Sequence, residues 1–271
     1  MPEGDTILRA ARTLSRAISG RELDRLALGS VRDRGPLREI ELRPHVRIKG
    51  VEARGKHLLI AFTDGRTLHS HMGMTGSWHL YRPGEPWRLR ERAARAVLET
   101  DDAVAVCFTP HTLELLSEPA ERAEQIRRLG PDLSGDAPDL DEAVRWLRAL
   151  RPGDTEIGVA LLDQRISAGI GNVYKSETLA ACGVDPFAQI VDLGDDQIHE
   201  LFATASALLR RNASTVMRST VPGGLAVYGR AGRPCRRCGT AIRSRRQGEH
   251  ARTTYWCSSC QPSRSRVGAR A

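Results

Sequence analysis

The sequence predicts an α+β protein in which a strand-rich first part is followed by a helical second part and a small metal-binding module. Three observations support this prediction. Strand-like alternation recurs between residues 23 and 108, and helical periodicity dominates between residues 139 and 212. Four cysteines then follow in a C-x2-C-x18-C-x2-C pattern. With 271 residues, the chain is long enough for two domains.

The strand-rich part is expected to begin with a helix over residues 6–18, whose apolar side chains fall on one face. Asp5 or Thr6 could cap this helix. Strands are then predicted at residues 23–31, 46–53, 57–62, 67–80 and 96–108. The Asp-Gly pair at 64–65 and the Asp-Asp pair at 101–102 would supply hairpin turns. Strands at this spacing predict a sandwich or a barrel.

The helical part is expected to follow a helix over residues 119–129, which ends at a Gly-Pro pair at 130–131. Helical patterning then returns at residues 139–150, 155–166, 173–182 and 195–212. We expect a zinc ribbon from Tyr228 onward, and a frayed basic tail over residues 262–271.

Positive charge is concentrated near the C-terminal end of the chain. Residues 230–270 contain eleven Arg, no Lys and one acid, Glu249, so this segment carries +10. Because the whole chain carries +8, the remainder sums to −2. This clustering and a pI near 9.6 predict a polyanionic partner such as nucleic acid, in preference to acidic metabolites.

The four cysteines, Cys235, Cys238, Cys257 and Cys260, are predicted to bind one structural Zn²⁺. Two C-x2-C pairs on tight turns can supply a closed tetrahedral shell of thiolates. A module this small has little core of its own, and zinc could add on the order of 10 kcal/mol to its folding. A knuckle that only fastens a tail is the alternative, but the neighbouring arginines favour binding to a polyanion.

The sequence gives no indication of secretion or of a membrane. Glu3 and Asp5 stand at the start without an apolar run, and no stretch approaches the roughly 20 apolar residues that span a bilayer. Cys107 and Cys182 lie in apolar surroundings and are expected to be buried thiols rather than a disulfide. We therefore expect a cytoplasmic protein, where a reduced zinc site persists.

A glycine-rich link, Ser-Ala-Gly-Ile-Gly-Asn at residues 167–172, joins two of the predicted helices. Its glycines let the backbone approach a ligand and leave amide hydrogens exposed at the start of the next helix. With Asn172 able to donate from its side chain, the link predicts a phosphate site. An ordinary helix link without a ligand is the alternative.

Pro2 and Glu3 are candidates for catalysis. If Met1 is removed, Pro2 becomes a secondary amine, and because α-amino groups titrate near about 8, a useful fraction is neutral at pH 7. A neutral amine can attack the anomeric carbon of a nucleoside and form an iminium. Glu3 could protonate the sugar ring oxygen or relay protons.

Four motifs occur together and in order: Pro2-Glu3-Gly4, Arg54-Gly55-Lys56, Gly169-Ile170-Gly171-Asn172 and the four cysteines. The motifs are physically unrelated, so their joint occurrence by chance is very improbable. On these motifs the chain resembles the formamidopyrimidine-DNA glycosylase/endonuclease VIII family of base-excision repair enzymes. The resemblance covers roughly residues 2–261.

The resemblance implies an N-terminal two-layer β-sandwich with a leading helix, a helix–two-turn–helix domain and a four-cysteine zinc finger. The corresponding domain boundaries are 1–130, 131–222 and 223–261, with a disordered basic tail over 262–271. It also implies a monomer that holds damaged DNA, duplex or single-stranded, in a cleft between its two domains.

The same resemblance implies a bifunctional enzyme that excises an oxidised base and then nicks the DNA backbone. Pro2 would be the Schiff-base nucleophile, and Glu3 the proton donor. Lys56 would contact a phosphate and assist β-elimination. Arg252 matches the zinc-finger arginine that assists δ-elimination, and Asn172 would hold a phosphate at the lesion.

Met74, on a turn flanked by glycines, matches the apolar residue that the family inserts into the base stack. A methionine of a hairpin core is the alternative. The sequence departs from the purine-directed members at residues 109–113, where Thr-Pro-His-Thr-Leu replaces an Arg-Arg-Phe element. The stretch between Asn212 and Tyr228 is also short. Both differences indicate the endonuclease VIII branch and oxidised pyrimidines.

Two other hypotheses stay open. The chain could be a non-catalytic zinc-dependent protein that binds DNA or RNA, in which case Pro2 and Glu3 have no chemical role. It could also be a purine-directed glycosylase for 8-oxoguanine or formamidopyrimidine. A covalent protein–DNA intermediate distinguishes the first hypothesis from an enzyme, and a panel of lesions distinguishes the second.

Overall fold

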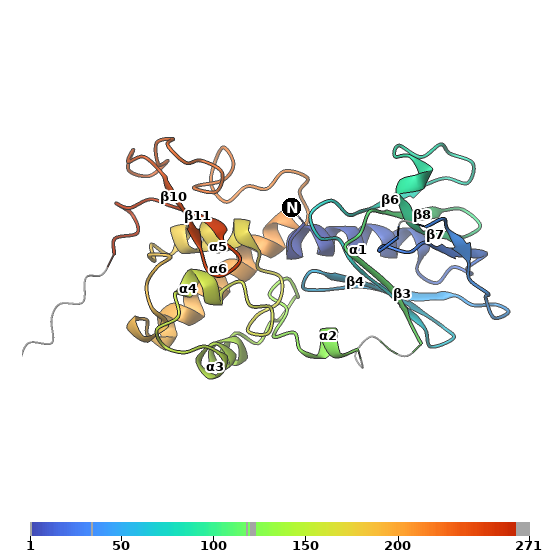
Figure 1. The fold of residues 1–271 in the computed structure, drawn as a ribbon, viewed down its shortest axis with the longest axis horizontal. Helices are drawn as coiled ribbons and strands as arrows, with labels where there is room; N and C mark the ends of the chain where they lie inside the picture. The colour runs from blue at the N-terminus through green and yellow to red at the C-terminus, as the bar shows by residue number, and fades with distance from the viewer. Residues whose placement is uncertain (1, 34, 118, 120–122, 264–271) are drawn as a thin grey trace, which may run out of the picture. The chain divides into compact units, whose positions relative to one another are not determined.

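The computed structural model of the chain describes residues 2–33, 35–117, 119 and 123–263. The chain forms two compact units, which divide between Arg128 and Leu129. The first, here called the strand unit, has a core built by strands and one helix. The second, the helical unit, has a core built mainly by helices (Figure 1). The α+β fold class is confirmed.

The strand unit is a two-sheet sandwich preceded by helix α1 (Gly4–Ile18). Within the described residues, one sheet has the order β2-β1-β7-β8-β6 and the other β3-β4-β5-β9, and all neighbouring strands are antiparallel. The strands are β1 (Arg25–Leu28), β2 (Arg38–Glu39), β3 (Ile48–Arg54), β4 (His57–Phe62), β5 (Thr67–His71), β6 (Ser77–Tyr81), β7 (Ala94–Glu99), β8 (Val104–Phe108) and β9 (Thr112–Leu116). A short 3₁₀ helix, η1 (Glu91–Ala93), precedes β7.

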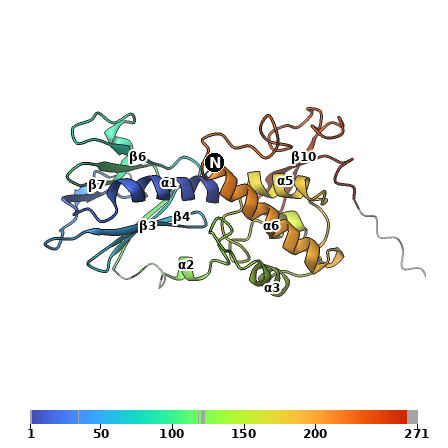
Figure 2. The same ribbon diagram turned by 180° about the vertical axis from the view of Figure 1, so that it is seen from behind.

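The core of this unit lies between α1 and the two sheets, and both views show α1 running along the sandwich (Figure 2). Ile7, Leu14 and Ile18 are buried because helical geometry brings residues at this spacing to one side. They belong to one core cluster with Leu58 of β4 and Leu98 of β7, so a single core joins the helix and the two sheets.

The predicted cap of α1 is wrong. The N-cap residue is Glu3, whose carbonyl accepts hydrogen bonds from Thr6 N at 2.9 Å and Ile7 N at 3.1 Å. Asp5 lies inside the first turn and is completely buried. The helix therefore begins at Gly4, because a main-chain carbonyl and not the predicted side chain closes its first turn.

The predicted strand over residues 67–80 is two strands in different sheets. β5 pairs with β4 and β9, whereas β6 pairs with β8. A tight turn separates them, and Gly76 N donates to Met72 O at 2.9 Å. A Cβ at Gly76 would lie 2.4 Å from Met72 O, so glycine is required where the chain crosses between the sheets.

Other strand predictions were closer. The segment 57–62 coincides with β4, and the segment 96–108 is the hairpin of β7 and β8, with its turn at 101–102 as expected. Strand 23–31 shortens to β1, and neither β2 nor β9 was predicted. β9 was missed because its five residues follow directly on a proline-containing turn.

The helical unit contains α3 (Leu140–Leu150), α4 (Ile157–Ala160), α5 (Asn172–Ala181), 3₁₀ helix η3 (Ile190–Asp192) and α6 (Asp195–Asn212). An antiparallel hairpin of β10 (Arg243–Gln247) and β11 (Arg252–Trp256) follows between the two cysteine pairs. α6 coincides with the predicted segment 195–212. Among the described helices, none is long and apolar enough to cross a membrane.

Two helix predictions were too long. The segment 155–166 forms only α4, because Asp163 Oδ1 accepts from Arg165 N at 3.1 Å and turns the chain. Among the described residues of the segment 119–129, the helix α2 covers only Glu124–Arg127. Part of that prediction, residues 120–122, and most of the predicted tail, residues 264–271, lie outside the described residues.

Candidate active site and nucleic-acid interface

Pro2 and Glu3 stand where the chain enters the strand unit. Pro2 lines a cavity of about 310 Å³, together with Met72 and Trp78. Glu3 is completely buried. The start of the chain thus combines an imino acid on a cavity wall with a neighbouring carboxyl group that is withdrawn from water.

Lys56 occupies the two-residue turn of the β3–β4 hairpin, in which Arg54 pairs with His57. Gly55 has φ +58°, so it takes the first central position of a type II′ turn, where glycine avoids a steric penalty. The turn thus gives the Arg54-Gly55-Lys56 motif a structural reason, and it fixes where the backbone of Lys56 lies.

Three histidines, His57, His69 and His71, cluster near Lys56 on one face of the four-stranded sheet. Leu58 and Ile60 of β4 point into the core, so His57 points to the opposite face. His57 pairs with His71 across β4 and β5, with ring centroids 5.0 Å apart, and His57 Nδ1 lies 2.8 Å from His69 Nε2. This cluster was not predicted from the sequence, although the His-x-His pattern of β5 places two histidines on one face.

These imidazoles are neutral at pH 7. Burial, the other two histidines and the Lys56 ammonium lower the pKa of His57 to about 3. Burial and then Lys56 lower the pKa of His71 to about 4, and burial lowers the pKa of His69. Lys56 therefore supplies positive charge to the cluster while the imidazoles supply neutral hydrogen-bonding groups.

The cluster predicts that acid destabilises the strand unit. Below about pH 6.5 the unfolded chain protonates these histidines while the folded chain does not, so stability falls with pH. The loss is expected to be about 1.4 kcal/mol per pH unit for each of His57 and His71, down to their folded pKa values. Hydrogen exchange of β4 and β5 peptides at pH 7 and pH 5 measures it. The double variant His57→Gln/His71→Gln should show a flatter pH dependence.

Met74 projects from the turn between β5 and β6 and is 72% exposed, which excludes a core role. Gly73 makes the turn possible, since it has φ +62° and a Cβ there would lie 2.7 Å from His111 Cβ. Reciprocal bonds between Thr75 and Thr109, of 3.5 Å and 3.1 Å, join this turn to the 109–113 segment. The methionine is therefore exposed on a braced turn.

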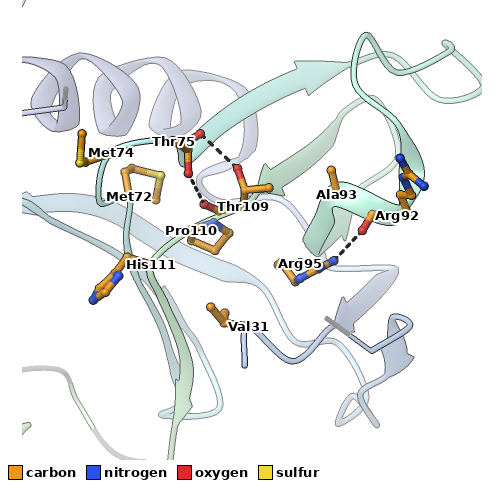
Figure 3. A pocket seen from close by; sticks show the side chains of 10 residues that line it. All are labelled: Val31, Met72, Met74, Thr75, Arg92, Ala93, Arg95, Thr109, Pro110 and His111. Carbon is orange, nitrogen blue, oxygen red and sulfur yellow. Dashed lines mark hydrogen bonds between the residues drawn. The ribbon is translucent and has the colours of Figure 1, made fainter. Parts of the chain in front are cut away.

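A cavity of about 860 Å³ lies beside Met74, and Figure 3 shows its lining. Arg92 and Arg95 face it, together with His111 and Pro110. Arg95 is only 5% exposed, and its Nη1 donates to the carbonyls of Ala94 and Arg92 at 2.6 Å and 2.9 Å. Arg92 of η1 and Arg95 of β7 thus line the same cavity as the 109–113 segment, which contains no arginine.

The glycine-rich link before α5 is held by Gln164. Its Oε1 accepts from Gly169 N at 3.1 Å, and its Nε2 donates to Ile170 O at 2.9 Å. Asn172 is the first residue of α5, and its Nδ2 donates to Thr253 O at 2.7 Å. Asn172 therefore lies beside the residue that follows Arg252.

Glu177 of α5 is a buried acid that was not predicted as a functional residue. It binds the segment that leads into the cysteine module. Its carboxylate accepts from the backbone N–H groups of Ala226, Val227 and Tyr228 at 2.8, 2.9 and 2.7 Å, and from Thr220 Oγ1. Charge-assisted bonds of this kind are strong when buried. Helix α5 thus positions the start of the cysteine module. This contact joins residues far apart in the sequence, so it becomes visible only in the folded structure.

A second buried chain connects α5 to the hairpin. Lys175 Nζ donates to Thr254 Oγ1 at 2.7 Å, and Thr254 Oγ1 donates to Gln247 Oε1 at 2.7 Å. Gln247 Nε2 donates to Glu156 Oε2 at 2.8 Å. Through these contacts, β10 and β11 are tied to the helices of the same unit.

The four cysteines form one cluster, with all their sulfur atoms within 4.8 Å of one another. Cys235 Sγ lies 3.9 Å from Cys260 Sγ, and Cys238 Sγ lies 3.5 Å from Cys257 Sγ. Metal–sulfur bonds of about 2.3 Å in a tetrahedron place sulfurs about 3.8 Å apart, so the cluster fits a metal ion. Burial and the neighbouring thiols raise the pKa of Cys260 to about 12, and a bound cation would reverse this effect.

Two exposed arginines of the module also make contacts within their own unit. Arg236 donates to the carbonyls of Leu225, Pro222 and Gly223, and Arg245 stacks 3.7 Å from the ring of Phe187. Arg252 is exposed at the start of β11 and has no ion pair among the described residues. The basic charge is therefore divided between structural contacts and side chains available to a ligand.

The structure thus gathers the candidate residues into two sets. In the strand unit, Met72 lines both cavities, that of Pro2 and that of Met74, while Lys56 lies near the adjacent His71. In the helical unit, Asn172 contacts the hairpin that carries Arg252.

Both units match family models, and together they define the class of two-domain DNA glycosylases. Residues 1–111 match the formamidopyrimidine-DNA glycosylase N-terminal domain, and residues 129–221 match the formamidopyrimidine-DNA glycosylase H2TH domain. The chain belongs to the formamidopyrimidine-DNA glycosylase/endonuclease VIII family. The resemblance seen in the sequence motifs is confirmed.

Among curated relatives, the chain is 41% identical over 267 residues to a probable endonuclease 8 2 of Streptomyces coelicolor, covering 96% of this chain and 94% of the relative. It is 37% identical over 267 residues to the DNA-(apurinic or apyrimidinic site) lyase Nei2 of Mycolicibacterium smegmatis, covering 96% and 99%.

Solved structures of the family share the fold. MutM (Fpg) of Thermus thermophilus matches with a TM-score of 0.76 at 29% identity, covering 96% of this chain and 98% of that one. Lactococcus lactis Fpg in complex with DNA containing an oxidised pyrimidine matches with a TM-score of 0.78 at 26% identity, covering 96% and 100%.

Proposed function

We propose that this protein is a bifunctional DNA glycosylase and AP (apurinic/apyrimidinic) lyase of base-excision repair. It excises oxidised bases, preferentially pyrimidines, through a Schiff base on Pro2, and it cuts the strand by β,δ-elimination. The observation that supports this most is Pro2 on a cavity wall next to the completely buried Glu3. The relatives named as endonuclease 8 and as an AP lyase support both activities.

In the first step, the Pro2 nitrogen forms a bond to C1′ of the damaged nucleoside, and the bond from C1′ to the base breaks. The base leaves as an anion and takes up a proton. Glu3 donates a proton to the sugar ring oxygen, the ring opens, and the nitrogen lone pair forms the iminium as the amine loses its proton.

Two eliminations follow from the iminium. Loss of a C2′ proton breaks the C3′–O bond, and a second proton loss breaks the C5′–O bond, so the sugar is released from both phosphates. We assign Lys56 to the first elimination and Arg252 to the second, each stabilising a departing phosphate. Asn172 holds a phosphate at the lesion, and Met74 fills the space that the flipped nucleotide leaves.

The ion in the cysteine cluster is proposed to be Zn²⁺, held by Cys235, Cys238, Cys257 and Cys260. Four sulfur ligands in a closed tetrahedron are typical of structural zinc, which stabilises folding and leaves no open position for a substrate. Its role is then to hold the β10–β11 hairpin and so to place Arg252.

Borohydride trapping tests the catalytic proposal. The metal-replete protein should form a covalent adduct with DNA that carries an abasic site or an oxidised pyrimidine, since borohydride reduces the iminium to a stable amine. Binding without any adduct would instead support a non-catalytic zinc-dependent DNA-binding protein.

A lesion panel tests the pyrimidine preference, which rests on the absence of an Arg-Arg-Phe element at residues 109–113 and on the short stretch between Asn212 and Tyr228. Excision of thymine glycol and dihydrouracil should exceed excision of 8-oxoguanine opposite cytosine, measured as single-turnover rates. The reverse order would support the purine-directed alternative.

Arg252→Ala is expected to reduce δ-elimination product at least tenfold, because the departing phosphate loses a charge-assisted donor. The thermal midpoint should change little, since Arg252 is exposed and makes no ion pair among the described residues. Gel analysis of the cleaved strand ends measures the ratio of β to δ products. Arg246→Ala on the neighbouring strand β10 is the matched control and should keep this ratio.

A further inference from the structure

The histidine cluster contains a chain of hydrogen bonds that fixes the position of one proton. Gln125 Nε2 of α2 donates to Glu114 Oε2 of β9 at 2.8 Å, and it lies 3.0 Å from His69 Nδ1. An amide nitrogen donates but does not accept, so His69 Nδ1 is the acceptor of this bond and not a donor to Glu114 Oε2, which lies farther away at 3.5 Å. The proton of the neutral His69 ring is therefore on Nε2.

The same argument carries to His57. His69 Nε2, now the donor, lies 2.8 Å from His57 Nδ1, which must accept. The proton of the neutral His57 ring is therefore on Nε2. Gln125 and His69 thus select one tautomer of His57, as an outer partner does for a catalytic or metal-binding histidine.

His57 Nε2 has no hydrogen-bond partner among the described residues, and it is not among their fully buried polar atoms that lack one. The side chain stands at the start of β4, on the face turned away from the core, and follows Lys56 in the chain. An oriented N–H group beside an ammonium group is suited to bind an anionic oxygen.

The titratable groups around His57 come from several elements. Lys56 lies in the hairpin turn, His69 and His71 on β5, His111 before β9, and Glu114 on β9. Burial and the neighbouring positive or ionisable groups hold the pKa of His57 at about 3. His57 therefore donates as a neutral ring at pH 7, and Lys56 supplies the charge.

We propose that His57 is a phosphate-binding residue, which donates its Nε2 proton to a phosphodiester oxygen of the DNA strand next to Lys56. His69 and Gln125 are positioning residues that orient this donor. The inference rests on the proposed function, because it takes DNA to be the ligand. It adds a hydrogen bond from a neutral imidazole to the contact proposed for the Lys56 ammonium group.

DNA binding tests the contact without any chemical step. The probe is a duplex with a tetrahydrofuran abasic analogue, and dissociation constants are measured with the full-length metal-replete protein from 50 to 200 mM salt. His57→Phe should weaken binding about tenfold, because a hydrogen bond to a charged group is lost. His57→Gln keeps an N–H donor and should stay within about threefold of wild type. His199→Phe, at an exposed position of α6, is the control and should not change the affinity.

The salt dependence separates a neutral donor from a charged one. Lys56→Met should reduce the slope of log Kd against log salt by about 1, whereas His57→Phe should leave the slope unchanged. The proposal is overturned if His57→Phe binds as wild type does, or if it changes the slope as Lys56→Met does. If borohydride trapping fails but His57→Phe still weakens DNA binding as expected, the catalytic function is contradicted and this contact is not.

Nitrogen NMR of the histidine rings tests the tautomer directly. His57 should carry its proton on Nε2 in wild type at pH 7, and His69→Phe should release this preference and weaken DNA binding less than His57→Phe does. A wild-type His57 protonated on Nδ1, or one that titrates near pH 6.5, would contradict the role of the positioning residues.

Discussion

Pro2→Gly is expected to slow base excision and strand cleavage at least 100-fold while leaving affinity for abasic-site DNA within about twofold. A secondary amine gives an iminium that is permanently charged, so it withdraws electrons from C1′ and acidifies the C2′ proton at any pH. The primary amine of glycine gives an imine that must first be protonated. Glycine also loses the ring that fixes the nitrogen on the cavity wall, and misplacement of a reacting group reduces rates strongly.

Single-turnover kinetics with a lesion-containing duplex measure the effect, and the borohydride adduct of wild type should map to the N-terminal peptide. Pro83→Gly, in an exposed loop of the same unit, is the matched control and should retain full activity. Wild-type protein that excises bases while retaining Met1, shown by intact mass, would contradict the role of Pro2.

The most accurate predictions from the sequence were the helices and strands whose ends coincide with turn residues or with the end of a periodic apolar pattern. β4 and α6 were placed at their observed bounds, because turn residues follow the first and a clear helical period runs through the second. The segment 67–80 looked continuous because apolar and β-branched residues occur on both sides of the turn. Only the strand pairings show that the chain changes sheets there, at the turn where Gly76 N donates to Met72 O.

The residues of the candidate site also fall into those that the sequence predicts and those that only the fold brings together. Motifs in the sequence identified Pro2, Glu3, Lys56 and the cysteines, since these residues stand in short patterns that a family resemblance can carry. The histidine cluster could not be derived, because His57 and His69 come together only when β4 pairs with β5. Burial of acids such as Glu177 is likewise a property of packing between distant segments.

The arginine excess of the cysteine module illustrates a limit of charge counting. All eleven arginines were attributed to a polyanionic partner, yet Arg236 and Arg245 make contacts that stabilise the module itself. A guanidinium group has five donors and a flat surface, so it can bind carbonyls or stack on a ring as well as bind a phosphate. Part of this arginine excess therefore contributes to the packing of the module itself.

Cys238→Ser, or removal of the metal by a chelator, is expected to unfold the β10–β11 hairpin and to reduce DNA affinity at least 100-fold. Structural zinc supplies on the order of 10 kcal/mol to modules of this size, which exceeds what the small cluster of Val227, Ile242 and Cys257 can replace. Hydrogen exchange should show loss of protection over residues 243–256, while the sheets of the strand unit keep theirs. Cys182→Ser, at a half-buried thiol outside the cluster, is the control.

Unfolding of the hairpin should also destabilise helix α5 of the same unit, because the hairpin supplies hydrogen-bond partners to buried groups of α5. Unfolding of β11 removes Thr254 from the completely buried Lys175, and Thr253 O from Asn172. A buried ammonium group that loses a partner costs several kcal/mol, so α5 should lose protection together with the hairpin. If Cys238→Ser instead retains protection over both segments and binds DNA normally, the four sulfurs do not hold a structural metal, and the buried polar chain alone maintains the module.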